Sequence, residues 1–266
     1  MLLWISIILQ AGILLLLYVI ATKIKLRFAD FDRKFEKLEI LAKKNINIQE
    51  RNISFIENKA TEIQNTAGIY LLDFKFPVFF GEWAIDSNLG KFLIDYIIEH
   101  KPQNILEIGS GTSTVLISKL MSKLEYTHNH LVVDHEEKYL RKTSEILTLN
   151  SINTHTKLLW LPLERKTILG EEYLYYRNLE EEIGDICLDF VIIDGPPEST
   201  GNLARFPALP LLHEKLSKNA VLILDDYCRE QEKAIVSKWL SLYPDFSLEI
   251  IEKGHQCAIL RKKGSS

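Results

Sequence analysis

Carboxylates and a glycine turn stand at the ends of several apolar segments of this 266-residue chain. The segment 104–108 leads directly into Gly109-Ser110-Gly111, and the segment 131–134 ends in Asp134, followed by His135. Two glycines one residue apart let a backbone turn tightly and approach a ligand, and the next helix offers free N–H groups. An acidic side chain at the next strand end can accept both hydroxyl hydrogen bonds of a ribose. The pair predicts a nucleoside ligand, whereas the glycine turn alone would equally suit an ordinary strand-to-helix connection.

The turn departs from the dinucleotide-binding fingerprint in two ways. Thr114 holds the place of the third glycine, and Glu107 puts a carboxylate directly before the turn. A carboxylate there repels a pyrophosphate and attracts a cationic ligand. A dehydrogenase that uses NAD is therefore the weaker alternative.

Three more aspartates follow two later apolar segments. Asp194 ends the segment 188–194, and Asp225 and Asp226 end the segment 220–226. If these strands are neighbours, their carboxylates meet at one cleft and repel one another unless a cation lies between them. Mg²⁺, Mn²⁺ and Ca²⁺ prefer such oxygen ligands. The sequence predicts a divalent metal site here; the alternative is that one carboxylate caps a helix and another is solvated.

Apolar strand-like segments alternate with helical ones along most of the chain, which predicts a doubly wound α/β fold around a mostly parallel, seven-stranded sheet. A closing hairpin should add an antiparallel strand at or near one edge, and ligands should bind beyond the carboxyl ends of the strands. The charged excursion over 163–185 suits either part of a ligand pocket or a surface insertion with its own helix. The expected strands are 104–108, 131–134, 157–161, 188–194, 220–226, 247–252 and 256–261, and the expected helices are 88–100, 113–124, 137–149, 208–217 and 229–242.

The first residues predict an uncleaved transmembrane anchor over 1–22. Residues 2–21 are apolar apart from Gln10 and Gly12, and about 20 helical residues cross the roughly 30 Å hydrocarbon core. A cleaved signal peptide is the alternative, but no basic segment precedes the apolar run and no clear cleavage site follows it. Basic residues follow the span at once, so the positive-inside rule predicts a single-pass membrane protein with a cytoplasmic body.

A helical stalk is expected over 23–66. Its apolar residues Ile24, Phe28, Phe31, Phe35, Leu38 and Ala42 follow alternating spacings of four and three, which is typical of a coiled coil. The register then meets Asn45, Gln49 and Asn52. A stalk that pairs two copies of the chain and a helix lying on the body or the membrane surface both fit this pattern.

Composition excludes several other classes. The chain is 47% hydrophobic, which is too high for a disordered protein, and its net charge of −4 gives no case for a nucleic-acid partner. The three cysteines (Cys187, Cys228, Cys257) lack the spacing of a disulfide scaffold or zinc site and suit a reducing compartment.

The ordered blocks NILEIGSGTSTVLIS, VVDHEEKYL, LDFVIIDGPP, ARFPALPLL and AVLILDD resemble class I S-adenosylmethionine-dependent methyltransferases, whose fold is Rossmann-like. The resemblance is greatest to the bacterial group related to catechol O-methyltransferase and cephalosporin-biosynthesis methyltransferases. It covers about residues 80–262 and implies a methyltransferase domain over 67–266.

The resemblance implies roles for particular residues. S-adenosyl-L-methionine would be bound by Glu107, Gly109, Ser110, Gly111, Ser113, Asp134, His135 and, through a looser match, Pro162. Asp194, Asp225 and Asp226 match the ligands of Mg²⁺ or another divalent cation in metal-dependent members, and Asp194 is the expected catalytic residue. The catechol enzymes carry a lysine base three residues after the first metal aspartate, where this chain has Pro197.

These features predict a membrane-anchored enzyme that O-methylates a small molecule or a glycan or cell-envelope precursor. A bound divalent cation would lower the pKa of the acceptor hydroxyl. The block from Glu198 to Arg205 is expected to form the acceptor wall, where Arg205 would either pair with an anionic acceptor or cap the aspartates. A non-catalytic, membrane-anchored nucleoside-binding or scaffold protein is the alternative from another functional class.

Overall fold

The computed structural model describes residues 2–81, 84–126, 128–152 and 155–263, with side chains from residue 12 onward. The chain divides into two compact units, Met1–Glu57 and Asn58–Ser266. Helix α1 (Leu2–Tyr70) supplies all the described residues of the first unit and the first residues of the second.

The predicted stalk is helical, and its apolar side chains are exposed. Ile24, Phe28, Phe31 and Phe35 are each at least half exposed. Among the described residues, no helix combines the length and the apolar character needed to cross a membrane. The predicted span over 2–21 includes residues 2–11, whose side chains lie outside the described part of the chain.

The last turns of α1 pack on the body, so the body begins earlier than residue 67. The Asn65 side-chain amide donates to Asn88 Oδ1 over 3.0 Å, and Ser87 Oγ donates to the carbonyl oxygen of Glu62 over 3.1 Å. Ile69 is fully buried. The helix continues through Gly68 to Tyr70.

The body is built on the predicted seven-stranded sheet, in the order β3-β2-β1-β6-β7-β9-β8. The β3-β2-β1-β6-β7 pairs are parallel, and β9 runs antiparallel to both β7 and β8, which confirms the expected hairpin at the edge. The strands are β1 (Asn104–Ile108), β2 (Asn129–Asp134), β3 (Thr156–Trp160), β6 (Leu188–Ile193), β7 (Leu216–Leu224), β8 (Phe246–Ile251) and β9 (Cys257–Lys262).

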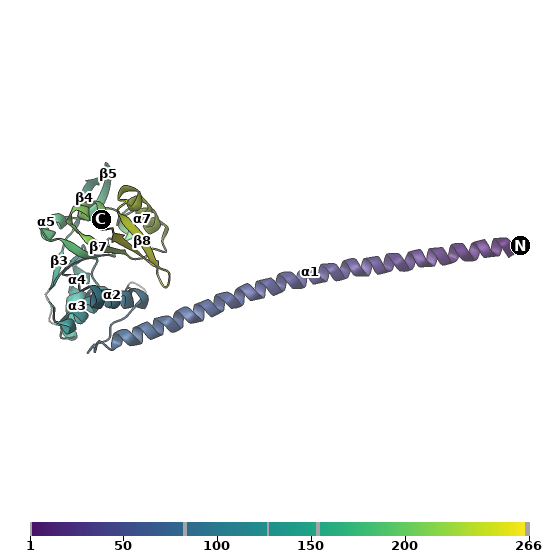
Figure 1. The fold of residues 1–266 in the computed structure, drawn as a ribbon, viewed down its shortest axis with the longest axis horizontal. Helices are drawn as coiled ribbons and strands as arrows, with labels where there is room; N and C mark the ends of the chain where they lie inside the picture. Colours follow the sequence, from purple (N-terminus) through teal and green to yellow (C-terminus); the bar gives the residue numbers. More distant parts are fainter. Residues whose placement is uncertain (1, 82–83, 127, 153–154, 264–266) are drawn as a thin grey trace. The chain divides into compact units, whose positions relative to one another are not determined.

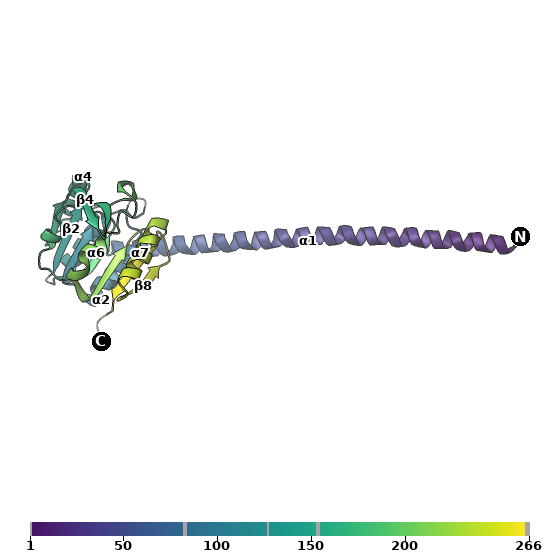
Figure 2. The same cartoon turned by 90° about the horizontal axis from the view of Figure 1, so that it is seen from above.

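Helices cover both faces of this sheet. Figure 1 shows α2 (Ser87–His100) and α3 (Thr112–Leu124) on one side, which also carries α4 (Glu137–Leu149) against α3. The opposite side carries α5 (Leu179–Ile183), α6 (Ala208–Leu212) and α7 (Glu230–Leu242), and Figure 2 shows α6 and α7 lying over the strands. Each side has its own buried apolar cluster.

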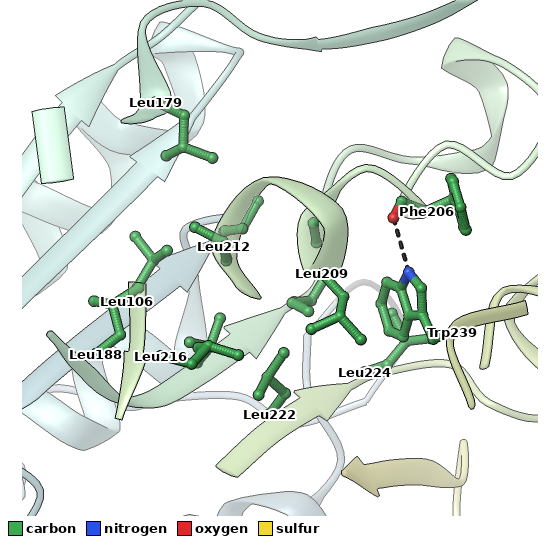
Figure 3. Close-up of a cluster of buried hydrophobic side chains, with 14 of the residues drawn as sticks. Leu106, Leu179, Leu188, Phe206, Leu209, Leu212, Leu216, Leu222, Leu224 and Trp239 are labelled. Carbon is green, nitrogen blue, oxygen red and sulfur yellow. Dashed lines mark hydrogen bonds between the residues drawn. The ribbon is translucent and has the colours of Figure 1, made fainter. Parts of the chain in front are cut away.

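Trp239 of α7 is the largest fully buried side chain on the α6–α7 side. Its indole Nε1 donates to the carbonyl oxygen of Phe206 over 2.9 Å, and the ring packs beside Leu209 (Figure 3). The indole therefore ties α7 to the segment that enters α6, directly after Arg205.

One local prediction needs correction, and one open expectation is resolved in detail. The helix expected over 208–217 ends at Leu212 and continues as a 3₁₀ turn, His213–Lys215, because Leu216 already pairs with Leu188 as the start of β7. The excursion over 163–185 forms an antiparallel hairpin of β4 (Leu163–Ile168) and β5 (Glu171–Tyr176), followed by the short α5.

Candidate functional site

The glycine turn lies at the carboxyl end of β1, as predicted. Gly109 has φ +102°, and a Cβ there would lie 3.1 Å from the carbonyl carbon of Asp194. Glycine is needed at this position because the end of β6 passes so close to the turn. Gly111 is the N-cap of α3, and a Cβ on it would meet nothing within 4 Å. The start of α3 is therefore not covered by neighbouring side chains of the described residues at Gly111.

Asp134 and the glycine turn are brought together at the ends of β1 and β2. Asp134 Oδ2 accepts hydrogen bonds from the backbone N–H of Ser110 over 2.9 Å and from Ser110 Oγ over 2.7 Å. Its Oδ1 accepts from the backbone N–H of Glu136 over 2.9 Å. Burial by itself would raise the pKa of Asp134, but the hydrogen bonds from His135, Glu136 and Ser110 outweigh burial and lower it. Asp134 is therefore held as a carboxylate, the form that accepts ribose hydroxyls.

His135 lies beside this carboxylate and against the β4–β5 hairpin. Its Nδ1 is 3.4 Å from Asp134 Oδ1, and its ring stands nearly perpendicular to that of Tyr176, with 6.1 Å between centroids. Pro162 lies at the base of the same hairpin, where its carbonyl oxygen accepts from the backbone N–H of Arg177 over 3.0 Å. His135 and Pro162, two of the residues expected to bind the cofactor, thus both lie at the end of the hairpin that carries Tyr176 and Arg177.

Glu107 and Ser113 point into the protein in this structure. Glu107 is fully buried, and its carboxylate accepts from Ser113 Oγ, from Thr114 Oγ1 over 2.9 Å and from His130 Nε2 over 3.2 Å. These bonds fasten the start of α3 to β1 beneath the glycine turn. Direct contact of Glu107 and Ser113 with a cofactor stays a prediction, while their bracing of the turn is visible.

The three predicted metal ligands do converge at the ends of β6 and β7, but an arginine lies among them. Arg205 Nη2 is 3.2 Å from Asp194 Oδ1 and 3.0 Å from Asp226 Oδ2. It also donates to the carbonyl oxygen of Asp194 over 3.0 Å, while Nη1 donates to that of Asp225 over 2.9 Å. Arg229 Nη1 adds an ion pair of 2.9 Å to Asp226 Oδ2.

The expectation of a divalent metal at this cluster is not supported. Within the described ranges, no group of three His, Cys, Asp or Glu side chains could hold a metal ion. Arg205 supplies the positive charge that the carboxylates require. Of the two roles expected for Arg205, pairing with an anionic acceptor or capping the aspartates, the structure shows the second. Burial, followed by the charge of Asp225, raises the pKa of Asp194 well above its ordinary value, and Arg205 partly opposes this rise.

Glu232 was not singled out from the sequence, and the contacts of Cys257 and Tyr176 in this region were not expected from it. Glu232 of α7 is buried with its Oε1 3.8 Å from Arg205 Nη1, and the Cys257 thiol donates to Asp225 Oδ1 over 3.0 Å. Tyr176 is fully buried, and its hydroxyl has no hydrogen-bond partner among the described residues. A Cβ placed on Gly195 would lie only 2.5 Å from that hydroxyl. For Glu232 the sequence signal was the acidic first turn of α7.

The β4–β5 hairpin and the expected acceptor wall border one cleft. Its volume is about 380 Å³, and its lining includes Arg165, Tyr173, Thr200, Asn202 and Ala204. Ala204 directly precedes Arg205 in the chain. Of the two expectations for the 163–185 excursion, this cleft favours the ligand pocket, although α5 shows that the excursion also contains a helix of its own.

Solved structures share this fold. An O-methyltransferase from Bacillus cereus in complex with SAH matches with a TM-score of 0.53 and 15% identity, over 77% of this chain and 91% of that one. An SAH-bound methyltransferase from Podospora anserina, PaMTH1, matches with a TM-score of 0.52 and 14% identity, over 68% and 80%. The O-methyltransferase TomG from Streptomyces achromogenes, in complex with SAM, matches with a TM-score of 0.51 and 14% identity, over 68% and 82%. No protein-family profile and no curated protein sequence matches the chain.

At these identities the likeness concerns the fold. The body has the seven-stranded class I methyltransferase fold, with its glycine turn and Asp134 at the carboxyl ends of neighbouring strands. The Rossmann-like architecture expected from the resemblance is confirmed.

Proposed function

We propose that this chain is an S-adenosyl-L-methionine-dependent O-methyltransferase. The observation that carries the proposal is the pairing of Ser110 and Asp134 beside the open N-terminus of α3, at the ends of β1 and β2. Nucleoside ligands bind in such crevices of doubly wound sheets. Structural neighbours with this sheet hold SAM or SAH, which supports the choice of cofactor.

Each part of the site has a task in this reaction. The bound cofactor supplies a sulfonium methyl group for in-line displacement by an acceptor oxygen. Asp134 would orient the ribose, the α3 N-terminus and the glycine turn would cradle the methionine end, and the cleft beside Tyr173 and Asn202 would position the acceptor. Because the transfer is favourable once the atoms are aligned, positioning supplies most of the rate enhancement.

The acceptor class proposed is a hydroxyl of a small molecule or of a glycan or cell-envelope precursor. The cleft presents hydrogen-bonding side chains from Arg165, Thr200 and Asn202 together with the Tyr173 ring. Polar groups of this kind suit a polyhydroxylated acceptor better than an apolar one.

Binding and turnover are tested separately. Calorimetry on the full-length protein should show binding of SAM and SAH but not of NAD, and Asp134→Asn should weaken both. Asp95→Asn is the matched control, because Asp95 is exposed on α2 and forms an ion pair with the nearby Lys91. Release of SAH with an added acceptor would establish catalysis, whereas binding without turnover across an acceptor screen would favour the non-catalytic nucleoside-binding or scaffold protein. Binding of NAD in preference to SAM would refute the proposal.

We further propose that the amino-terminal residues anchor the body to a membrane, with the body on the cytoplasmic side. The support is the apolar sequence of 2–21 and the basic residues that follow it. Flotation with lipid vesicles should recover the full chain and not a form starting at Asn58. In cells, protease added outside should leave the body intact; its cleavage there would refute the orientation.

We also propose that the exposed stalk pairs with a second copy of the chain in parallel. With Phe28 and Phe35 at heptad position a, the basic residues Arg27 and Lys34 occupy position g, and Asp32 and Glu39 occupy position e. In a parallel pair, position g of one helix faces position e of the next heptad of its partner, so both contacts join opposite charges. Charge complementarity therefore supports a homodimer over a helix lying on the membrane surface.

A further inference from the structure

The carboxylates at the ends of β6 and β7 surround one side chain. Arg205 is buried, and its two terminal nitrogens contact Asp194, Asp226 and, at 3.8 Å, Glu232. They also donate to the backbone carbonyl oxygens of Asp194 and Asp225. One guanidinium thus joins the ends of two strands and the first turn of α7.

One carboxylate oxygen of each of the three aspartates is already engaged, and a guanidinium lies where a divalent cation would have to bind. Asp194 Oδ1 and Asp226 Oδ2 face Arg205, and Asp225 Oδ1 accepts from the Cys257 thiol and from the backbone N–H of Asp226 over 2.8 Å. Mg²⁺ requires near-octahedral oxygen coordination, and Ca²⁺ takes six to eight oxygens. The donor set therefore does not fit the metal that the resemblance implies.

An arginine suits this position better than a lysine. A guanidinium is planar and permanently charged, and it can direct parallel N–H groups at two acceptors, whereas an ammonium is a point charge. The two terminal nitrogens of Arg205 together join both strand ends. Nη1 donates to the backbone carbonyl oxygen of Asp225, and Nη2 donates to the backbone carbonyl oxygen and Oδ1 of Asp194 and to Asp226 Oδ2.

We propose that Arg205 takes the place of the divalent cation as a built-in positive charge, so that this site works without a metal. The inference rests on the proposed methyltransferase function, but the occupation of the aspartates can be tested independently. Arg205 is a positioning residue: it holds the carboxylates and the loop after β6 in place beside the acceptor wall. The strand ends are then ordered at any metal concentration.

Metal binding by the full-length protein is the direct test. Titration with Mn²⁺, followed by electron paramagnetic resonance, should show no stoichiometric site on the wild type, and neither EDTA nor Mg²⁺ should move its thermal unfolding midpoint. Arg205→Ala should unfold at a lower temperature, because buried carboxylates lose their partner. Added Mn²⁺ should then raise the midpoint of this variant, and Asp194→Asn in the same background should abolish that gain.

Arg229→Ala is the matched control, since Arg229 is more exposed and contacts Asp226 from outside the cluster. Its midpoint should not respond to Mn²⁺. If Arg205→Ala does not fold by itself, the variant is refolded from denaturant with and without Mn²⁺. Recovery of folded protein only in the presence of Mn²⁺ supports the proposal.

Two results would overturn the inference. One is a stoichiometric Mn²⁺ site on the wild type that Asp194→Asn removes. The other is an Arg205→Ala protein that Mn²⁺ neither stabilises nor helps to refold. Because these measurements need no turnover, failure of the proposed methyltransferase activity would be recognised separately, by absence of SAM binding and of SAH release.

Discussion

Replacing Gly195 with alanine tests how the β4–β5 hairpin meets the strand-end site. The new Cβ would lie 2.5 Å from the Tyr176 hydroxyl, while its next contacts, with Gly109 Cα and the Ile108 carbonyl oxygen, are at 3.4 Å. Tyr176 is fully buried, so its ring cannot swing away without disturbing its neighbours. The clash should therefore cost about 1–3 kcal/mol of unfolding free energy, the usual range for an overpacked core.

The partner substitution Tyr176→Phe removes the atom that clashes. The hydroxyl has no hydrogen-bond partner among the described residues, and an unsatisfied buried polar group typically costs about 1–3 kcal/mol, so its loss should be neutral or stabilising. In the double variant the new methyl group has room, and the unfolding free energy should return toward the wild-type value. The coupling between the two substitutions should reach at least about 1 kcal/mol, well above the roughly 0.5 kcal/mol scatter of independent sites.

Urea denaturation of the four proteins measures this cycle. Gly201→Ala is the matched control, because a Cβ on Gly201 meets nothing within 4 Å. SAM affinity should follow the same order, since Gly195 lies against the glycine turn. A Gly195→Ala protein as stable as the wild type, or a loss that Tyr176→Phe does not relieve, would refute the proposed packing.

Three further predictions concern the cofactor site, the core and the stalk. Hydrogen bonds hold the pKa of Asp134 below its ordinary 3.8, so the ionised carboxylate stabilises the fold above that pH. The difference in unfolding free energy between the wild type and Asp134→Asn should therefore shrink as pH falls through the lowered pKa of Asp134. A flat difference from pH 6 to pH 3 would contradict this. Trp239→Phe should cost about 2–3 kcal/mol in urea denaturation, because it leaves a gap and an unpaired Phe206 carbonyl; a loss near zero would contradict the packing. Asp32→Lys with Glu39→Lys should weaken self-association by roughly thirtyfold or more in sedimentation equilibrium. The two contacts occur twice in a symmetric parallel pair, exposed pairs contribute about 0.5 kcal/mol each, and like charges add repulsion to that loss. Unchanged association would exclude the parallel register.

The ends of the strands could be predicted from the sequence, because buried parallel strands are continuous apolar segments and polar residues follow where each strand ends. The sequence placed Asp134 beside the glycine turn, and the structure confirms the contact through Ser110. It also indicated that Asp194, Asp225 and Asp226 share one edge of the sheet, which follows from adjacent β6 and β7. Local periodicity likewise indicated the closing hairpin.

The sequence did not predict which residue would neutralise Asp194, Asp225 and Asp226. Arg205 lies in a loop, outside any periodic segment, and sequence alone allowed it to face an acceptor or the carboxylates. Only the path of the chain between β6 and α6 brings its guanidinium between two strand ends. The β4–β5 hairpin was likewise not predicted, because the buried Tyr175 and Tyr176 are flanked by charged residues that are typical of an exposed segment.

The sequence by itself therefore determined the order of the strands of the main sheet along the chain, the class of that sheet and the strand ends at which the carboxylates lie, because these depend on local patterns of burial. Tertiary structure decided which charge neutralises the aspartates and which side chains Glu107 meets, since both depend on segments distant in the chain. Glu107 shows the difference most clearly: its place before the glycine turn suggested a ligand contact, yet Ser113, Thr114 and His130 enclose its carboxylate. A buried charge binds the nearest donors that folding supplies, and only the fold decides which donors are near.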